Sequence, residues 1–313
     1  MIHFYQTQDN CVRELKVPVP GCWISVVDPT AQEIQQLIET YGLDSGFVRS
    51  SLDEEESSRI EREDDQTLII VDTAMSEIQT EETILFFTLP LGIIITEQYV
   101  FTITLKENRV LHDMANGVVR GVQTRMKTRF VMQLLLRITS IYLMYLKQID
   151  KTSYVMEQKL SGAMKNKELI QMLELEKSLV YFSTSLKANE VTIEKLLRGR
   201  TIKLYDEDQD LLEDVLIEVR QAIEMSNIYS GILSSMVEAF GSVISNNMSF
   251  VMWRLTVVTI IMAIPTMIFS FYGMNIHENS GGLPLANVWF PLAISAVLSA
   301  AVGFIINFTQ KFK

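Results

Sequence analysis

Two long uncharged apolar runs near the C-terminus constrain the fold more than any other feature of the chain. Leu255–Tyr272 contains 18 residues without a charge, and Val288–Phe308 contains 21. A helix needs roughly 20 apolar residues to cross the ~30 Å hydrocarbon core of a bilayer. The sequence therefore predicts two membrane-spanning helices at the C-terminal end of a largely non-membrane chain.

A third apolar stretch, Phe130–Leu146, differs from these two runs because Gln133 and Arg137 interrupt it. A polar and a charged side chain suit a helix that is buried in a protein better than one that faces lipid. We therefore predict that this stretch is a buried helix of a cytosolic domain.

The distribution of basic residues predicts the orientation in the membrane. Arg254 precedes the first run, Lys311 and Lys313 follow the second, and residues 275–287 between them contain no Lys or Arg. By the positive-inside rule both termini are cytoplasmic, and the connecting loop is outside the cell. Residues 1–6 lack the basic and apolar regions of a signal peptide. The prediction is a multi-pass protein of the bacterial or archaeal plasma membrane.

The bulk composition excludes several classes of function. The net charge is −11, with 38 acids and 27 bases, which does not suit nucleic-acid binding but does suit a partner that is a metal cation. Cys11 and Cys22 are expected to be reduced thiols, and His3, His112 and His277 are too scattered for a zinc site. The chain has no phosphate loop and no protease, deaminase or ATP-binding spacing, so we do not predict an enzyme.

Residues 1–120 alternate between strand-like and helix-like patterns and predict a cytosolic α/β domain with a mixed sheet. Residues 31–41 form the predicted first helix, with Thr30 as its N-cap and Glu33 at the capping-box position. The predicted strands, rich in β-branched and aromatic residues, are 22–27, 66–73, 83–89, 91–96 and 100–105.

The pattern after Gly121 is helical. Residues 121–204 predict an antiparallel helical hairpin that breaks near Gly162. One helix of about 65 residues, roughly 100 Å long at 1.5 Å per residue, is then expected to join the soluble part directly to the first span. The remaining predicted segments are the stalk helix with transmembrane helix 1 at 205–272, the outer loop at 273–287, transmembrane helix 2 at 288–308 and a basic cytosolic tail at 309–313.

The first span has one face of small, hydroxylated or thioether side chains. Close helix–helix packing favours such residues, and so does a pore lining, in which hydroxyls contact the water shell of an ion. A single helix cannot enclose a pore, but several copies around an axis can. Pro265 removes one backbone donor and is expected to loosen the helix. The members of this stripe recur at steps of four and three and are Ser245, Ser249, Met252, Thr256, Thr259, Ala263, Thr266 and Ser270.

Tyr272-Gly273-Met274-Asn275 ends the first span, and a Gly-Met-Asn tripeptide at this place resembles the CorA family of magnesium channels. The early Trp23-Ile24-Ser25-Val26 strand, the Asp28-Pro29-Thr30 turn and the Leu52-Asp53 segment are also similar to that family. The resemblance extends over most of the chain, although the soluble part matches by its pattern of residues more than by identity. It implies an α+β membrane protein that assembles as a funnel-shaped homopentamer in the lipid bilayer, with five first spans lining the pore.

The resemblance implies that Gly273, Met274 and Asn275 form the selectivity filter. Mg²⁺ keeps its waters tightly, so five Asn275 amides are expected to bind the hydrated ion. The alternative is that Gly273 and Asn275 only cap the helix. Glu278 is a candidate acid at the outer mouth, where it would concentrate cations.

The sequence leaves the identity of the transported metal open. His277 suits Zn²⁺, Co²⁺ or Ni²⁺ better than Mg²⁺, and Gly281-Gly282-Leu283-Pro284 replaces the family's frequent Met-Pro-Glu-Leu run. A transporter of those metals with the same fold is therefore one alternative. A membrane-anchored scaffold or sensor that conducts nothing is the alternative from another class, although the hydroxylated stripe counts against it.

Two acidic clusters lie far from the predicted spans, at 53–56 and 206–214. Such runs are usually solvated surface. In the family, acids from neighbouring subunits bind regulatory Mg²⁺, and Asp53 and Asp214 lie near those positions by pattern. Mg²⁺ would then be both substrate and regulator, closing the pentamer when it bridges these acids. Glu238, seven residues before Ser245, is a candidate inner acidic ring.

Overall fold

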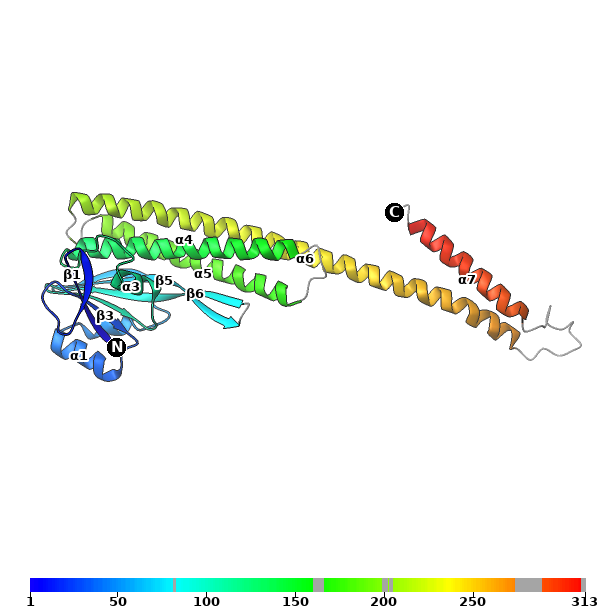
Figure 1. The fold of residues 1–313 in the computed structure, drawn as a ribbon, viewed down its shortest axis with the longest axis horizontal. Coiled ribbons are helices and arrows are strands. Elements are labelled where there is room, and N and C mark those ends of the chain that lie inside the picture. Colours follow the sequence, from blue (N-terminus) through cyan, green and yellow to red (C-terminus); the bar gives the residue numbers. More distant parts are fainter. Residues whose placement is uncertain (81–82, 160–165, 199–201, 203–204, 274–288, 311–313) are drawn as a thin grey trace, which may run out of the picture. The chain divides into compact units, whose positions relative to one another are not determined.

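The computed structural model describes residues 1–80, 83–159, 166–198, 202, 205–273 and 289–310. The chain forms two compact units, Met1–Val237 and Glu238–Lys313, and one helix runs through the boundary between them (Figure 1). The finer division that the sequence suggested stays a prediction.

The first unit is built on a seven-stranded sheet with the strand order β2-β1-β3-β7-β6-β5-β4. Only β3 and β7 pair in parallel, and the other neighbours are antiparallel. The mixed sheet predicted from the sequence is therefore confirmed. The strands are β1 (Ile2–Gln8), β2 (Cys11–Leu15), β3 (Trp23–Val27), β4 (Arg59–Glu63), β5 (Gln66–Thr80), β6 (Thr83–Ile95) and β7 (Val100–Thr104).

The prediction of separate strands at 83–89 and 91–96 is wrong, because β6 continues through Pro90. Proline lacks a backbone N–H and normally interrupts a central strand. Here β7 pairs with β6 only from Leu91 to Ile95, so Pro90 lies just beyond the end of that ladder. On its other side Pro90 stands opposite Asp72 of β5. The missing donor therefore removes no hydrogen bond to β7.

The first unit also has three short helices: α1 (Ala31–Tyr41), α2 (Ser45–Ser50) and α3 (Arg109–Ala115). The capping box predicted for α1 is present, with Thr30 accepting from the Glu33 N–H and Glu33 accepting from the Thr30 N–H. The structure confirms this helix at its predicted bounds.

Side chains alternate between the two faces of the sheet, as the period of a strand requires. Ile24 and Ile70 belong to a buried cluster with Leu37 of α1, on one face. Trp23 points to the other face, where its ring lies 5.3 Å from that of Phe130. The sheet is therefore covered on both sides, and this explains its continuous apolar runs.

Long helices cover the second face of the sheet (Figure 1). They are α4 (Lys127–Lys159) and α5 (Asn166–Leu197), and the beginning of α6 (Asp206–Tyr272) packs on them, with the Ser226 hydroxyl donating to the Leu179 carbonyl of α5. Phe182 of α5 lies between Tyr142 of α4 and Phe86 of β6, with ring centroids 5.1 and 6.3 Å away. The predicted single helix from residue 206 to 272 is present.

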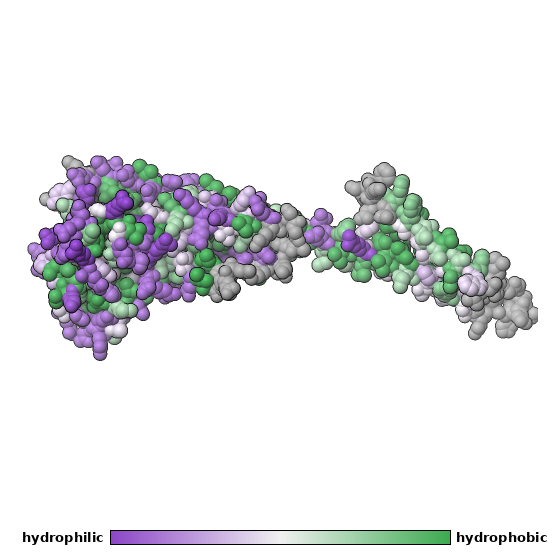
Figure 2. All heavy atoms as spheres, viewed as in Figure 1, coloured by the Kyte–Doolittle hydropathy of each residue, from purple (hydrophilic) through white to green (hydrophobic). Residues whose placement is uncertain are grey.

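The second unit consists of the rest of α6 and α7 (Trp289–Gln310). Three described helices are long and apolar enough to cross a membrane: α4, α6 and α7. The most apolar window of α4 is 61% buried within the protein, whereas those of α6 and α7 are 0% and 11% buried. In Figure 2 apolar residues cover most of the visible surface of the second unit, whereas the visible surface of the first unit is a mixture of polar and apolar residues. The interpretation of Phe130–Leu146 as a buried helix is therefore confirmed.

Candidate functional site

The small and hydroxylated stripe of α6 lies on the surface of the second unit. All seven of its predicted pore-lining members are exposed: Ser249, Met252, Thr256, Thr259, Ala263, Thr266 and Ser270. Thr259, Ala263, Thr266 and Ser270 also line a shallow open groove, together with Met262 and Met267. The stripe is thus continuous along the most apolar part of the helix.

The hydroxyl groups of the stripe have a common geometry. Thr256, Thr259 and Thr266 donate to the carbonyl oxygens four residues earlier, at 2.8 to 2.9 Å, and Ser249 does so at 3.0 Å. Each proton is therefore used within the helix. The hydroxyl oxygen keeps lone pairs that can accept hydrogen bonds from outside the helix.

Helix α7 packs on the opposite face of α6. The half-buried residues of that face are Val257, Ile261, Ile264, Pro265, Ile268 and Tyr272. At about 100° per residue they lie on the far side of the helix from the stripe. The ring of Tyr272 meets that of Phe290 at 6.5 Å, and Ser299 of α7 contacts Ile261. Packing against α7 therefore does not account for the hydroxylated stripe.

Gly273 is the one member of the predicted filter that the structure describes. Its N–H donates to the Phe269 carbonyl at 2.9 Å, and an added Cβ would lie 3.3 Å from that same oxygen. A larger residue at the end of α6 would therefore make a tight contact with this carbonyl, which glycine avoids. Met274, Asn275, His277 and Glu278 lie outside the described residues, as does the rest of the predicted outer loop.

Asp53 lies on an exposed turn after α2. Its carboxylate accepts from the Glu55 N–H at 3.1 Å, while Glu56 pairs with Arg59. The turn is anchored by buried Ser51, which packs so closely on Gly92 of β6 that a Cβ there would lie 1.9 Å from the serine oxygen. The glycine is thus needed for this approach, which places Asp53 beside the sheet.

Asp214 is exposed on the first part of α6, and its charge acts on Glu218 one turn later. Burial, and secondly the negative charge of Asp214, raise the pKa of the Glu218 carboxyl. Among the residues that the structure describes, no donor reaches the buried Oε2 of Glu218. Sequence reasoning did not single out Glu218, whose only sequence signal was its spacing of four from Asp214.

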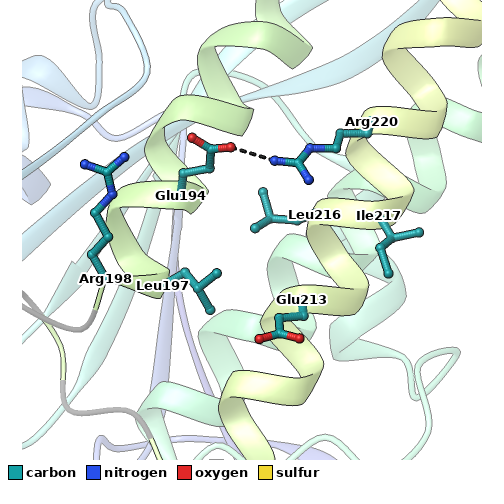
Figure 3. A pocket seen from close by; sticks show the side chains of 7 residues that line it. All are labelled: Glu194, Leu197, Arg198, Glu213, Leu216, Ile217 and Arg220. Carbon is teal, nitrogen blue, oxygen red and sulfur yellow. Dashed lines mark hydrogen bonds and ion pairs between the residues drawn. The ribbon is translucent and has the colours of Figure 1, made fainter.

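The neighbouring acid Glu213 points instead into an open groove between α5 and α6 (Figure 3). Arg220 crosses this groove and pairs with Glu190 and Glu194, each at 2.7 Å. The acidic run at the start of α6 is therefore divided between different surroundings, with Glu207 paired to Arg129. Only part of the run remains available for a cation.

The two candidate regulatory acids have different neighbours within one chain: Asp53 caps its own turn, and Asp214 faces Glu218. Within the described ranges, no three His, Cys, Asp or Glu side chains form a group that could hold a metal ion. Glu238 is exposed on α6, and its carbonyl accepts from the Ser242 hydroxyl at 3.2 Å.

A buried polar link between the sheet and α5 was also not predicted. Asn189 donates to the Asp72 carbonyl at 2.8 Å and accepts from the Asp72 N–H at 2.9 Å. Burial raises the pKa of the Asp72 carboxyl, an effect that a hydrogen bond from Ser185 partly offsets. Nothing in the local sequence pattern distinguishes Asp72 from an exposed strand residue.

The family model described as CorA-like Mg²⁺ transporter protein matches residues 21–309. The cobalt/magnesium transport protein CorA of Methanocaldococcus jannaschii is 31% identical over 284 residues, which cover 88% of this chain and 86% of that protein.

Solved structures give the same result. The complete structure of the CorA magnesium transporter from Methanocaldococcus jannaschii matches with a TM-score of 0.76 at 25% identity, over 99% of this chain and 96% of that one. The cytoplasmic domain of ZntB from Vibrio parahaemolyticus matches with a TM-score of 0.60 at 13% identity, over 79% and 97%, and shares the fold alone. Because the family model spans almost the whole sequence and the archaeal protein matches over most of it, this chain belongs to the CorA-like family of divalent-cation transporters.

Proposed function

We propose that the chain imports Mg²⁺ as a homopentameric channel whose path is lined by the hydroxylated stripe of α6. The observation that carries this proposal is the combination of exposed hydroxyl oxygens and their position opposite α7. Five such helices around an axis place rings of acceptors toward the centre. The waters of a hydrated cation donate hydrogen bonds to these acceptors, so the ion need not lose its shell.

Selection of the hydrated ion is assigned to the loop that follows α6. Gly273 closes the helix, Met274 packs the loop, and the five Asn275 amides contact the waters of the ion. Glu278 attracts cations to the outer mouth, and Glu238 forms an acidic ring at the inner end. In this arrangement both termini are cytoplasmic, with Arg254 and the C-terminal lysines on the inner side of the plasma membrane.

The Asn275→Ala substitution tests this assignment. In a strain that lacks its own magnesium uptake, we expect the variant to fail to restore growth at low Mg²⁺, while Thr184→Ala, a change at an exposed residue of α5, restores it. Growth equal to that of the wild type with Asn275→Ala, at matched protein levels in the membrane, would show that the amide does not select the ion.

Regulation by cytosolic Mg²⁺ is assigned to Asp53 and Asp214 of neighbouring subunits, which repel one another when no cation lies between them. High Mg²⁺ bridges them and holds the channel closed, and low Mg²⁺ releases them. The double variant Asp53→Asn/Asp214→Asn is expected to conduct at internal Mg²⁺ concentrations that close the wild type. If internal Mg²⁺ inhibits the double variant as strongly as the wild type, the two acids are solvated surface residues without a regulatory role.

Co²⁺ is the second candidate substrate, because the archaeal relative is named a cobalt/magnesium transport protein. Zn²⁺ and Ni²⁺ are also to be measured, since His277 in the outer loop is a good ligand for them. Flux of Mg²⁺, Co²⁺, Zn²⁺ and Ni²⁺ into proteoliposomes ranks the four ions directly. A mass measurement of the purified complex tests the pentamer, and a dimer would contradict the shared path.

A further inference from the structure

Pro265 lies inside α6 and leaves one backbone carbonyl without its usual partner. The helix continues on both sides of this residue. Proline has no N–H, so it cannot donate to the carbonyl of residue 261, four positions earlier. In a lipid environment an unpaired backbone carbonyl is strongly unfavourable, because no water is present to donate a hydrogen bond to it.

Ser299 of α7 supplies a donor at this position. Its hydroxyl donates to the Ile261 carbonyl oxygen at 3.5 Å, which is longer than an ordinary O–H···O hydrogen bond and therefore a weak one. Ser299 is half-buried between the two helices, and the nearby Gly303 would place a Cβ 3.5 Å from Ile261 Cδ1. The hydroxyl therefore reaches the one carbonyl of α6 that Pro265 leaves free.

The other described serine of α7 behaves differently and provides a comparison. Ser295 is more deeply buried than Ser299, but its hydroxyl donates to the Leu292 carbonyl of its own helix at 3.0 Å. Ser295 contributes packing without a polar link to α6. The two serines thus separate the effect of a small side chain from the effect of an interhelical hydrogen bond.

The position of the link matters for the stripe. Ile261 and Pro265 lie on the face of α6 that contacts α7, opposite Thr259, Ala263 and Thr266. Apolar contacts between helices in lipid are non-directional, because lipid tails are as apolar as the side chains. A hydrogen bond to one named carbonyl is directional, so it sets the rotation of α6 about its own axis.

We propose that Ser299 is a positioning residue for transport: it bonds the carbonyl that Pro265 frees and so keeps the hydroxylated stripe turned away from α7. This inference rests on the proposed transport function for its effect on flux. Its effect on the pairing of the two helices does not depend on that function.

A double-mutant cycle between positions 299 and 265 tests the proposal on the full-length protein. Pro265→Ala restores an N–H that can bond the Ile261 carbonyl, which makes the Ser299 hydroxyl redundant. The four proteins are the wild type, Ser299→Ala, Pro265→Ala and the double variant. Ser299→Thr serves as the conservative variant and Ser295→Ala as the packing control. Each is measured for its thermal midpoint in detergent and for Mg²⁺ flux into proteoliposomes.

We expect Ser299→Ala to lower flux by about three- to tenfold, the range that one interhelical hydrogen bond in a membrane accounts for. Its thermal midpoint should fall by about 2–4 °C. Ser299→Thr should keep both properties near those of the wild type, and Ser295→Ala should leave flux within about twofold. In the Pro265→Ala background the further change Ser299→Ala should have almost no effect on either readout.

Equal effects of Ser299→Ala in the two backgrounds would overturn the proposal, because the serine would then act without regard to the freed carbonyl. So would a loss of flux with Ser295→Ala as large as that with Ser299→Ala. If the wild type moves no Mg²⁺, the proposed function fails, while the thermal midpoints still decide whether the two positions are coupled.

Discussion

Helix α4 and the end of α6 contain similar apolar windows, each 18 residues long with at most two charges, but they have opposite surroundings. In α4 that window is 61% buried against the sheet and α5, and in α6 none of it is buried. Apolar length therefore does not separate a core helix from a membrane helix. The partners of each helix make the difference, since a core helix finds them within its own chain.

The two units also treat polar side chains differently. In the first unit, polar groups such as Asp72 and Asn189 are paired inside the core, where an unpaired group would be unfavourable. In the second unit, hydroxyl groups lie on one exposed face and use their protons within the helix. Paired polar groups in the core stabilise the fold of a single chain. Exposed hydroxyl oxygens on one face of an apolar helix instead need partners from outside the chain.

The largest test of this contrast compares two phenylalanines. Phe182 is fully buried in the first unit, so Phe182→Ala should lower the free energy of unfolding by about 3–5 kcal/mol. Phe269 is 47% exposed on α6, and Phe269→Ala should change the free energy of unfolding by less than about 1 kcal/mol in detergent. Urea unfolding followed by tryptophan fluorescence measures both, since Trp23 lies in the first unit and Trp253 and Trp289 lie in the second. Equal losses would mean that the two units do not differ in how they use apolar residues.

A smaller effect is expected from an isosteric exchange across α6. Thr259→Val removes one hydroxyl from each subunit's stripe and should lower Mg²⁺ flux about tenfold, which corresponds to about 1.4 kcal/mol. Val258→Thr adds a hydroxyl outside the stripe, at a residue that is 58% exposed, and should leave flux nearly unchanged. Proteoliposome uptake distinguishes them, and a reversed order would place the ion path on another face.

The smallest effect concerns Asp72, a half-buried acid of the first unit. Because burial raises the folded-state pKa of Asp72, its protonated form is favoured by folding. Its contribution to stability is therefore fully present below the ordinary carboxyl pKa of about 3.9 and is lost as pH rises through the higher folded-state value. Asp72→Asn should be more stable than the wild type at pH 7, by about 1–2 °C in thermal midpoint, with the difference vanishing in acid.

This pH dependence is checked by thermal melts of both proteins from about pH 3, below the ordinary carboxyl pKa, to about pH 8. Asp65→Asn, a change at an exposed acid in the turn before β5, is the matched control for the loss of one negative charge. A wild type that remains the more stable protein at pH 7 would show that the Ser185 hydrogen bond outweighs burial.

Local sequence signals predicted the elements that depend on neighbours in the chain. Thr30 and Glu33 predicted the beginning of α1, and the uninterrupted pattern after residue 205 predicted α6. The two strands expected around Pro90 were wrong because the outcome depended on where β7 ends, and that strand comes later in the chain. Glu218 and Asp72 were missed because their unusual environments come from α4 and α5.

The sequence by itself determined the number and length of the apolar runs, the family motif at 273–275, the charge distribution and the period of the hydroxylated stripe. These are properties of covalent order and helical spacing, so they can be read along the chain. Only the tertiary structure decided that α4 is a core helix and α6 is not, that α7 packs opposite the stripe, and that Ser299 reaches the carbonyl freed by Pro265. Those facts depend on which helix faces contact each other. Helical periodicity shows which residues share a face, but it does not show what that face packs against.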